Sequence, residues 1–312
     1  HARFAMGDRL DLEQKIVEYF GKQSNKKHRR GKILIATQVV EQSLDLDFDL
    51  LVTDLAPIDL ILQRIGREHR HFFRKRPQGY STPHCLVFSP MPNNECSEDW
   101  FADFFFKAKF VYPNHGQLWR TAKFLQDNPV LYFPEDSRRA IESVYGNNAL
   151  NIPESLQISS RDAEGDNYAE RDMATWNTLN LLEGYKRSQT QWVEDTISPT
   201  RLGEPTVTFR LGYYENDIIK PWYTARTLRK SWGLSEIRIL AYKMSSVVGP
   251  KNEIEQAARE RAIGEMPDKG KFSILFPLEP NEEDIWEGSG LTINGKEIRV
   301  AYDPSQGLIF YN

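Results

Sequence analysis

The sequence predicts an α/β fold, followed by a helical linker and a small α+β domain at the C-terminal end. Two short apolar runs without alternation, at 32–37 and 49–55, are typical of strands buried on both faces of a parallel sheet. A helical pattern with an apolar face follows them at 57–67. Beyond Gly184 the pattern of apolar and polar residues changes to alternating, strand-like segments. We therefore expect boundaries near 1–95, 96–184 and 185–312.

The first part should begin with a helix over 7–22. Asp8 is a suitable N-cap and Gly21 a suitable C-terminal stop, and an apolar stripe runs between them. A basic stretch follows, and Lys22–Lys32 holds six lysines and arginines. The default interpretation is a solvated mobile loop, and the alternative is a contact to nucleic-acid phosphates. The segment 84–90 predicts a third strand. Three strands are too few for a complete α/β lobe, so we expect the chain to begin partway through a domain.

The linker is predicted to be mostly helical. The aromatic run 100–112 favours a helix packed on a core over a stacking platform for nucleic acid. Helices are expected near 118–125 and 135–146, and the polar stretch 158–170 predicts a flexible connection. In the C-terminal part, strands are expected at 206–214, 216–223 and 271–278, a helix at 251–264, and a hairpin over 296–311 with its turn at 303–307.

Composition narrows the class of protein. The chain has 312 residues, 40% of them hydrophobic and 27% charged, and its apolar runs are interrupted by aspartate, so no membrane span is expected. Cys85 and Cys96 cannot form a disulfide framework, which favours a reduced, cytoplasmic setting. No leader is recognised, and the initial His1 indicates a piece of a longer chain. Residues 1–90 hold 15 Lys and Arg against 11 Asp and Glu, whereas the remainder is acidic. A basic part joined to an acidic part is typical of a protein that binds a polyanion through one of them.

The pattern Q-x-x-G-R-x-x-R, formed by Gln63, Gly66, Arg67 and Arg70, is the main candidate for chemistry. Arginine is always charged, and its planar fork of donors matches phosphate oxygens. Two arginines one helical turn apart near a helix end can hold a terminal phosphate as charge develops on it, an effect of roughly 10³–10⁵ in rate. A plain basic helix remains the alternative on this pattern alone.

A second stretch lies about 20 residues upstream. The predicted strand ends at Thr37 and Gln38, at the carboxyl edge of a parallel sheet, where α/β folds bind ligands. Asp45, Asp47 and Asp49 follow. Three close carboxylates can form a metal site, but we predict none here. The order of elements instead predicts that Thr37 and Asp45 share a cleft with the two arginines.

These residues carry a resemblance to a known family. The stretches "ATQVVEQSLDLDFD" and "QRIGREHRH" resemble motifs V and VI of superfamily 2 helicases, and more closely the helicase–nuclease of type I CRISPR–Cas systems. The start, "HARFAMGDRLDLEQ", is similar to that family's motif IV region. Segments such as "VYPNHGQLWRTAKFL" and "WGLSEIRI" resemble its linker and C-terminal domain in the type I-E branch.

The resemblance implies a fold and roles for particular residues. Residues 1–95 would be the C-terminal part of the second RecA-like lobe. Arg67 and Arg70 would reach the γ-phosphate of ATP, Gln63 would help to position them, and Asp45 would lie near the ribose. Thr37 and Gln38 would contact single-stranded DNA. Arg3 and Phe4 would line the same strand, although a purely structural role suits them equally.

Glu68 departs from the family pattern, because an uncharged residue is common at its position. It could pair with Arg64 or Arg70 and weaken the arginine finger.

The sequence holds no G-x-x-x-x-G-K-[ST] loop, no magnesium box and no His-Asp nuclease cluster. In the resembling family these parts lie on an N-terminal nuclease domain and a first helicase lobe, which would also supply the Mg²⁺ ligands and the nuclease metal. The implied partners are those two domains, single-stranded DNA and a CRISPR RNA-guided effector complex. We therefore expect these 312 residues alone to be inactive toward ATP. The alternatives are another superfamily 2 helicase, for repair or RNA, and a stand-alone binding module without catalysis.

Overall fold

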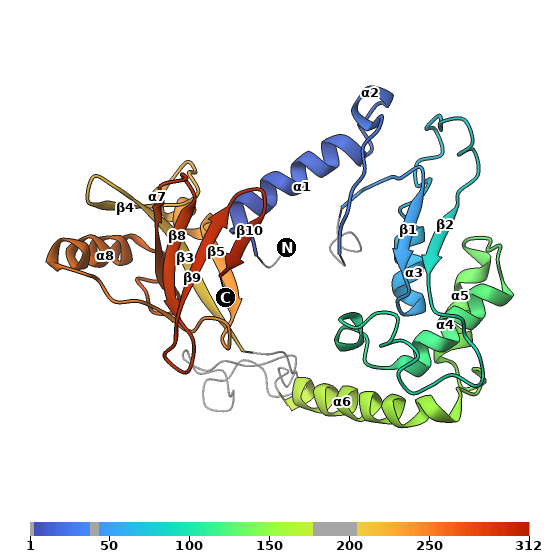
Figure 1. The fold of residues 1–312 in the computed structure, drawn as a ribbon. Helices are drawn as coiled ribbons and strands as arrows, with labels where there is room; N and C mark the ends of the chain where they lie inside the picture. The colour runs from blue at the N-terminus through green and yellow to red at the C-terminus, as the bar shows by residue number, and fades with distance from the viewer. Residues whose placement is uncertain (1–2, 38–43, 177–204, 312) are drawn as a thin grey trace, which may run out of the picture. The chain divides into compact units, whose positions relative to one another are not determined.

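The apolar stretches of the sequence pack into two separate units. A computed structural model describes residues 3–37, 44–176 and 205–311. One unit, here called the sheet unit, combines His1–Glu18 with Gly203–Asn312, and the other, the lobe unit, is Tyr19–Leu202 (Figure 1). These units cut the chain at other places than the expected boundaries near residues 95 and 184. The three-part division remains a prediction about functional segments.

Two parallel strands form the sheet of the lobe unit. Strand β1 (Leu51–Asp54) pairs in parallel with β2 (Cys85–Phe88), and the register places Leu51 beside Cys85. Both strands were predicted from their apolar runs. They carry the α/β character of this unit, since helix α3 lies in the chain between them.

The strand predicted over 32–37 does not form. Ile33 and Ile35 are 88% and 93% exposed, and the segment has an irregular backbone. A β-strand requires a neighbour whose N–H and C=O groups complete its ladder. Among the described residues β1 and β2 pair with each other, and neither pairs with this segment. The prediction of a strand here is therefore wrong. The segment has the apolar composition of a strand but lacks a pairing partner among the described residues.

Helix α3 (Ile58–Ile65) packs its apolar face on the linker helices. Pro57 precedes its first turn, Ile58 and Ile61 are fully buried, and Ile58 packs with Phe124 and Val144. The partner helices are α4 (His115–Asp127), capped by the Asn114 side chain, and α5 (Glu135–Tyr145). Both were predicted. The hydroxyl of Tyr145 also donates to Asp59 at 2.7 Å and ties the start of α3 to the end of α5.

The polar stretch 158–170 is helical, so the predicted flexible connection is wrong. It belongs to α6 (Gln157–Trp176), which follows the short 3-10 turn η3 (Glu154–Leu156). A narrow buried stripe that includes Ser160 and Ala163 holds it to α4. The Ser160 hydroxyl accepts a hydrogen bond from the backbone N–H of Gly116 at 3.1 Å. Because this stripe is small and polar, hydropathy alone does not reveal it.

The aromatic run 100–112 is divided between core and surface. Trp100 and Phe101 are buried in a core of the lobe unit that is separate from the core around Ile58. Phe106 and Phe110, in contrast, are 69% and 76% exposed. The segment forms turns and the 3-10 helix η2 (Ala108–Phe110), not the α-helix that was predicted.

The sheet unit contains a mixed sheet in the order β10-β9-β8-β7-β3-β4, with β5 paired to β3 and β6 to β8. Strand β3 runs parallel to β7, and the other pairs are antiparallel. Its strands and helices after the linker are β3 (Thr206–Glu215), β4 (Ile218–Pro221), α7 (Leu228–Leu234), β5 (Glu236–Leu240), β6 (Ser246–Val247), α8 (Glu253–Glu265), β7 (Ile274–Pro280), β8 (Trp286–Leu291), β9 (Glu297–Asp303) and β10 (Gly307–Phe310).

The two faces of this sheet are covered differently. On one face, Leu275 packs with Trp232 of α7 and Ala258 of α8. On the other face, the next residue, Phe276, packs in a second core with Phe209. This alternation is the period of two that a strand requires. The predicted strands, helix and hairpin are present, and Gly307 has a φ of +74° in the hairpin turn, which suits glycine. The fold is therefore α/β in the lobe unit and α+β in the sheet unit.

Helix α1 (Met6–Phe20) begins at Met6, so Asp8 is not its N-cap. The Asp8 carboxylate instead accepts hydrogen bonds from Trp222 Nε1 at 2.7 Å and from the Tyr302 hydroxyl at 2.6 Å. Tyr302 in turn accepts from the backbone N–H of Ala5 at 2.8 Å. The start of the chain is thereby fixed to the C-terminal sheet, a long-range contact that a local capping rule does not predict.

Candidate functional site

The two motif arginines follow helix α3 rather than lying on it. The helix ends at Ile65, and the N–H of Arg67 closes a turn on the carbonyl of Arg64 at 2.9 Å. The predicted helix over 57–67 is therefore too long at its C-terminal end. Gly66 and the turn after it direct the chain away from the helix axis. The spacing of Arg67 and Arg70 thus reflects a tight turn, not one turn of helix.

A strand-like contact fixes this turn to the aspartate-rich stretch. Phe48 N–H donates to the Arg67 carbonyl at 2.8 Å, and His69 N–H donates to the Phe48 carbonyl at 3.1 Å. Phe48 and Glu68 form a parallel bridge. Because Asp45 lies three residues before Phe48, this pairing brings it to the arginines. The predicted cleft shared by Thr37, Asp45, Arg67 and Arg70 stays a prediction, and the described contacts bring Asp45 to Arg70.

Asp45, Arg67 and Arg70 form a group that we call the Asp45 cluster. Arg70 Nε lies 2.8 Å from Asp45 Oδ1, with side chains 40% and 47% exposed, and His71 Nε2 lies 3.5 Å from the same oxygen. Burial lowers the pKa of Arg67, and the charge of Arg70 lowers it further, while Asp45 opposes both effects. The two guanidinium groups therefore repel each other, and the Asp45 carboxylate reduces that repulsion. An anion with several oxygens would relieve that repulsion, which fits the end of a triphosphate.

The remaining predicted residues belong to other segments of the chain. Gln63 is exposed in the last turn of α3, and Thr37 is exposed in the irregular segment before residue 38. Gln38 lies outside the described residues. Arg3 and Phe4 belong to the sheet unit, where the Arg3 carbonyl accepts a hydrogen bond from Leu308 N–H at 2.7 Å. Their assignment to a DNA strand stays a prediction.

Glu68 does not face the arginine finger. Its side chain is buried, and its carboxylate accepts a hydrogen bond from the His84 backbone N–H at 2.7 Å. Burial raises the pKa of Glu68, and backbone hydrogen bonds from His84 and Leu51 oppose the rise. The suggestion that Glu68 pairs with Arg64 or Arg70 is therefore wrong. Its carboxylate joins the turn to the segment just before β2 through the His84 N–H.

A second group of charges was missed by the sequence reasoning. Asp47 and Asp49 are held by three arginines, and we call this group the Asp47 network. Its members are Asp47, Asp49, Arg29, Arg74 and Arg76. Asp47 is fully buried, and the arginine side chains are 7–9% exposed. Burial by itself raises the pKa of Asp47, but hydrogen bonds and charge from Arg76 and Arg74 outweigh it and lower the pKa.

The Asp47 network also orders the basic stretch 22–32. Arg29 ends the short helix α2 (Lys26–Arg29), which Asn25 caps, and it reaches Asp49 at 2.8 Å. Arg74 donates to the Ser24 carbonyl at 2.7 Å. The expected mobile loop is therefore a short helix with an anchored end. The available sequence signal was the repeated spacing of two in Asp47/Asp49 and Arg74/Arg76, which indicates side chains on one face of extended backbone.

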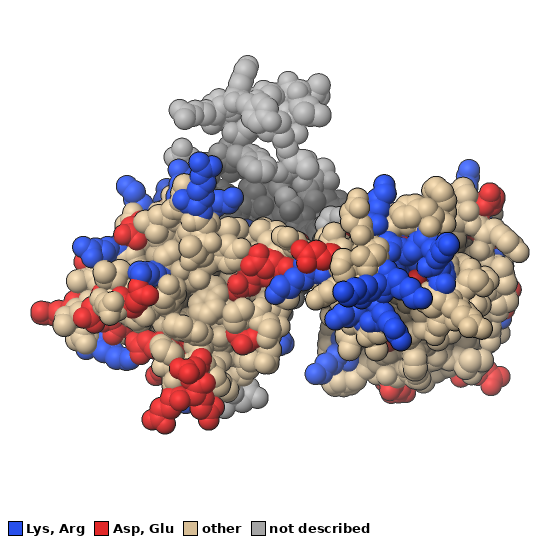
Figure 2. Space-filling view, turned by 90° about the horizontal axis from the view of Figure 1, so that it is seen from above, with Lys and Arg blue, Asp and Glu red and all other residues tan. Residues whose placement is uncertain are grey.

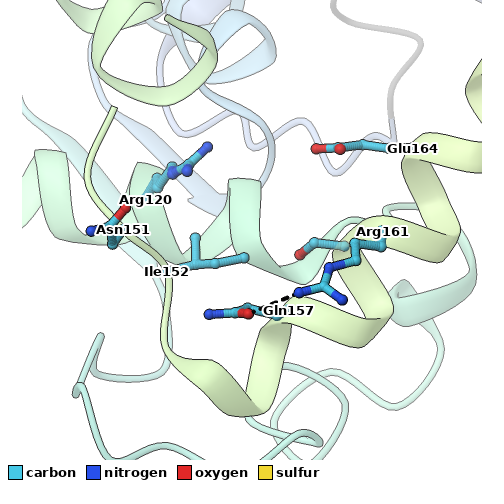
Figure 3. A pocket seen from close by; sticks show the side chains of 7 residues that line it. Arg120, Asn151, Ile152, Gln157, Arg161 and Glu164 are labelled. Atoms are coloured by element: carbon cyan, nitrogen blue, oxygen red, sulfur yellow. Dashed lines mark hydrogen bonds between the residues drawn. The ribbon is translucent and has the colours of Figure 1, made fainter. Parts of the chain in front are cut away.

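The lobe unit also has an open hollow of about 480 Å³ between α4 and α6 (Figure 3). Its lining includes Arg120, Gln157, Arg161 and Glu164. Arg120 already donates to the carbonyls of Leu150 at 2.6 Å and Val144 at 3.1 Å, and so caps the end of α5. None of the motif residues lines the hollow, and Arg120 has a structural role there.

Known proteins resemble this chain in sequence and in structure. A family model described as "CRISPR-associated nuclease/helicase Cas3, C-terminal" matches residues 1–72. The Escherichia coli (strain K12) CRISPR-associated endonuclease/helicase Cas3 is 38% identical over 156 residues, which are 49% of this chain and 16% of that protein. The Thermus thermophilus protein of the same description is 35% identical over 236 residues, 68% of this chain and 24% of the relative.

The fold is similar to solved structures of the same family. The crystal structure of T. fusca Cas3 matches with a TM-score of 0.69 and 27% identity, over 99% of this chain and 35% of that one. T. fusca Cas3 with ATP matches with a TM-score of 0.67 at the same identity and coverage.

The fold is thus that of part of a RecA-like helicase lobe with an accessory domain. The chain belongs to the family of CRISPR-associated nuclease/helicases described as Cas3 and corresponds to their C-terminal part. It spans about a sixth to a quarter of the length of these two relatives.

Among the described residues, no helix is both long and apolar enough to cross a membrane.

Proposed function

We propose that this chain is the C-terminal part of an ATP-dependent translocase on single-stranded DNA, which unwinds and degrades foreign DNA marked by a CRISPR effector complex. One observation carries the proposal: the turn after α3 and the Phe48 bridge bring Arg67, Arg70 and Asp45 to one place. The relatives named Cas3 nuclease/helicase support the reaction class, and the ATP-bound T. fusca structure supports the nucleotide.

In this proposal Arg67 and Arg70 bind the terminal phosphate of ATP, and Gln63 and Asp45 assist from the same edge of the lobe. ATP supplies the phosphoanhydride bond whose hydrolysis drives movement. The Asp45 carboxylate neutralises the arginines when no phosphate is bound, since it lies 2.8 Å from Arg70 Nε. Thr37 and Gln38 contact the DNA backbone. Mg²⁺, the phosphate cradle and the nuclease metal would be held by residues outside this chain.

The proposed partners include an RNA-guided effector complex. A solved structure described as "CRISPR RNA-guided surveillance complex, pre-nicking" contains a chain that matches with a TM-score of 0.65 and 26% identity. We assign effector docking or strand retention to residues 185–312, whose 17 Lys and Arg against 18 Asp and Glu leave no excess of positive charge for phosphate contact. We place the protein in the cytoplasm, where its free thiols Cys85 and Cys96 remain reduced.

Arg67→Ala in the longer protein tests the proposal. We expect DNA-stimulated ATP hydrolysis to fall by at least about 10²-fold, the scale of arginine-finger losses, with an unchanged thermal midpoint. Arg138→Ala is the matched control, because Arg138 is an exposed arginine of the same unit outside the Asp45 cluster and the basic stretch. Hydrolysis by Arg67→Ala at the parental rate would remove the assigned role.

The purified 312 residues should hydrolyse no ATP, because the proposal places the phosphate cradle elsewhere. Their affinity for ATP should be no better than about millimolar, near −4 kcal/mol. Calorimetry and phosphate release measure both. Turnover that survives repurification and disappears in Arg67→Ala would show a complete active site within this chain.

A further inference from the structure

Two phenylalanines that follow the Asp45 cluster are directed into solvent. Phe72 is 98% exposed and Phe73 is 55% exposed. Their ring centroids lie 5.8 Å apart at an interplanar angle of 80°, and His71 stacks on Phe73 at 5.4 Å and 18°. Burying a phenylalanine side chain ordinarily stabilises a fold. This fold forgoes that stabilisation at two adjacent positions.

The exposure of these rings is set by buried neighbours. Arg74 and Arg76, which follow directly, belong to the Asp47 network and have side chains 9% and 7% exposed. Arg76 also donates to the His71 carbonyl at 3.4 Å, and Arg74 N–H donates to the same carbonyl at 3.1 Å. The backbone on both sides of the phenylalanines is therefore fixed. The two rings are therefore held in place by the flanking backbone and do not sit at the tip of a flexible loop.

Positively charged side chains lie near the loop that carries the two rings. Arg74 bonds the carbonyls of Gly21 and Ser24, so the start of the basic stretch lies against the loop that carries the rings. The exposed cations of this stretch are Lys22, Lys26, Lys27, Arg30 and Lys32. Figure 2 shows lysine and arginine side chains gathered on the face of the lobe unit that carries α2. The carboxylates of Asp47 and Asp49 are already paired with three arginines and leave this positive charge uncancelled.

We propose that Phe72 and Phe73 form a base-stacking step for a single strand of nucleic acid, whose phosphates lie along the basic stretch at α2. Exposed aromatic rings beside a positively charged track are the features by which proteins bind single strands without sequence preference. A protein partner would also cover apolar rings, but the surrounding lysines favour a polyanion. This inference rests on the proposed function, and it adds a contact surface distinct from Thr37 and Gln38.

Fluorescence anisotropy with the 312-residue chain and a labelled oligothymidylate of about 15 nucleotides, a length such surfaces can cover, tests the step. Phe72→Leu with Phe73→Leu retains apolar bulk without rings and should weaken binding by about 10-fold or more. Phe72→Tyr with Phe73→Tyr retains the rings and should bind within about 2-fold of the parent, since stacking tolerates the hydroxyl. Phe106→Ala is the matched control, because Phe106 is an exposed ring of the same unit away from the step.

An oligonucleotide of abasic sites separates stacking from charge. It should bind the parent and the leucine variant equally, because no base is left to stack. Lys26→Ala with Lys27→Ala should reduce the slope of log affinity against log salt by about 1.4, or 0.7 for each lost phosphate contact on a single strand. The leucine variant should keep the parental slope.

Equal binding of oligothymidylate by the parent and the leucine variant would overturn the inference. So would a leucine variant that loses binding of free ATP but not of the strand, since the rings would then serve a nucleotide. Neither result depends on hydrolysis. A failure here would leave the Arg67→Ala test of the proposed function intact, and a failure of that test would leave this one intact.

Discussion

The Asp45 cluster and the Asp47 network contain the same residue types, and Asp45 and Asp47 lie two residues apart in the chain, yet their environments differ. The Asp45 side chain is 47% exposed, whereas that of Asp47 is fully buried. In the network, Asp47 and Asp49 accept from three arginines that are themselves nearly buried. In the cluster, water reaches the ion pair of Asp45 with Arg70. The difference teaches that burial, not residue type, separates a structural ion network from a candidate binding site.

Among the substitutions that test this difference, the largest loss of stability is expected in the Asp47 network. Asp47→Ala would leave Arg74 and Arg76 buried without their carboxylate, and removing one partner of a buried pair costs about 3–5 kcal/mol. Urea unfolding of the 312-residue chain, followed by a probe in the lobe unit, measures the loss. A loss below about 1 kcal/mol, the level of an exposed pair, would mean that the network is not structural.

The acid dependence of stability should follow from the same carboxylate. The folded pKa of Asp47 is below its ordinary 3.8, so the folded state binds fewer protons than the unfolded state near that pH. The stabilisation is then fully present above about pH 5 and is lost as the pH falls through the folded pKa. Unfolding free energies of the parent and Asp47→Asn should therefore converge between neutral pH and strong acid. A constant difference would contradict the lowered pKa.

The smallest effect is expected at Asp45. Asp45→Ala removes an exposed ion pair, so the unfolding free energy should change by less than about 1 kcal/mol. The same substitution removes the carboxylate that lies 2.8 Å from Arg70 Nε, and the affinity of the chain for inorganic phosphate should rise. Calorimetric titration with phosphate measures this. A destabilisation equal to that of Asp47→Ala would abolish the distinction between the two groups.

Local patterns predicted those parts of the fold that depend on neighbouring residues. The apolar runs of β1 and β2 and the amphipathic faces of α3, α4 and α5 are all readable within a few residues. The contact of Asp45 with Arg70 follows from the Phe48 bridge and not from the carboxyl edge of a strand at 32–37. The strand at 32–37 failed because pairing is not a local property. The polar helix α6 was missed because its contact stripe is small.

The Asp47 network could not be predicted for a similar reason. Arg74 and Arg76 lie 27 and 29 residues beyond Asp47, and no spacing rule links charges so far apart. The Asp8 contacts to Trp222 and Tyr302 join the two ends of the chain and are likewise invisible to a capping rule. Glu68 was misread because its charge suggested an arginine partner, whereas burial gave it a backbone donor.

The most direct test compares Arg70→Ala with Arg76→Ala in the longer protein, with the ATP hydrolysis rate and the thermal midpoint measured on the same samples. Arg70→Ala should lower kcat by at least about 10²-fold and leave the midpoint unchanged, because its pair is exposed. Arg76→Ala should lower the midpoint by several degrees, because it opens the buried network. Parental hydrolysis by Arg70→Ala, or equal loss of midpoint in both variants, would contradict the assignment of catalysis to the exposed group and structure to the buried one.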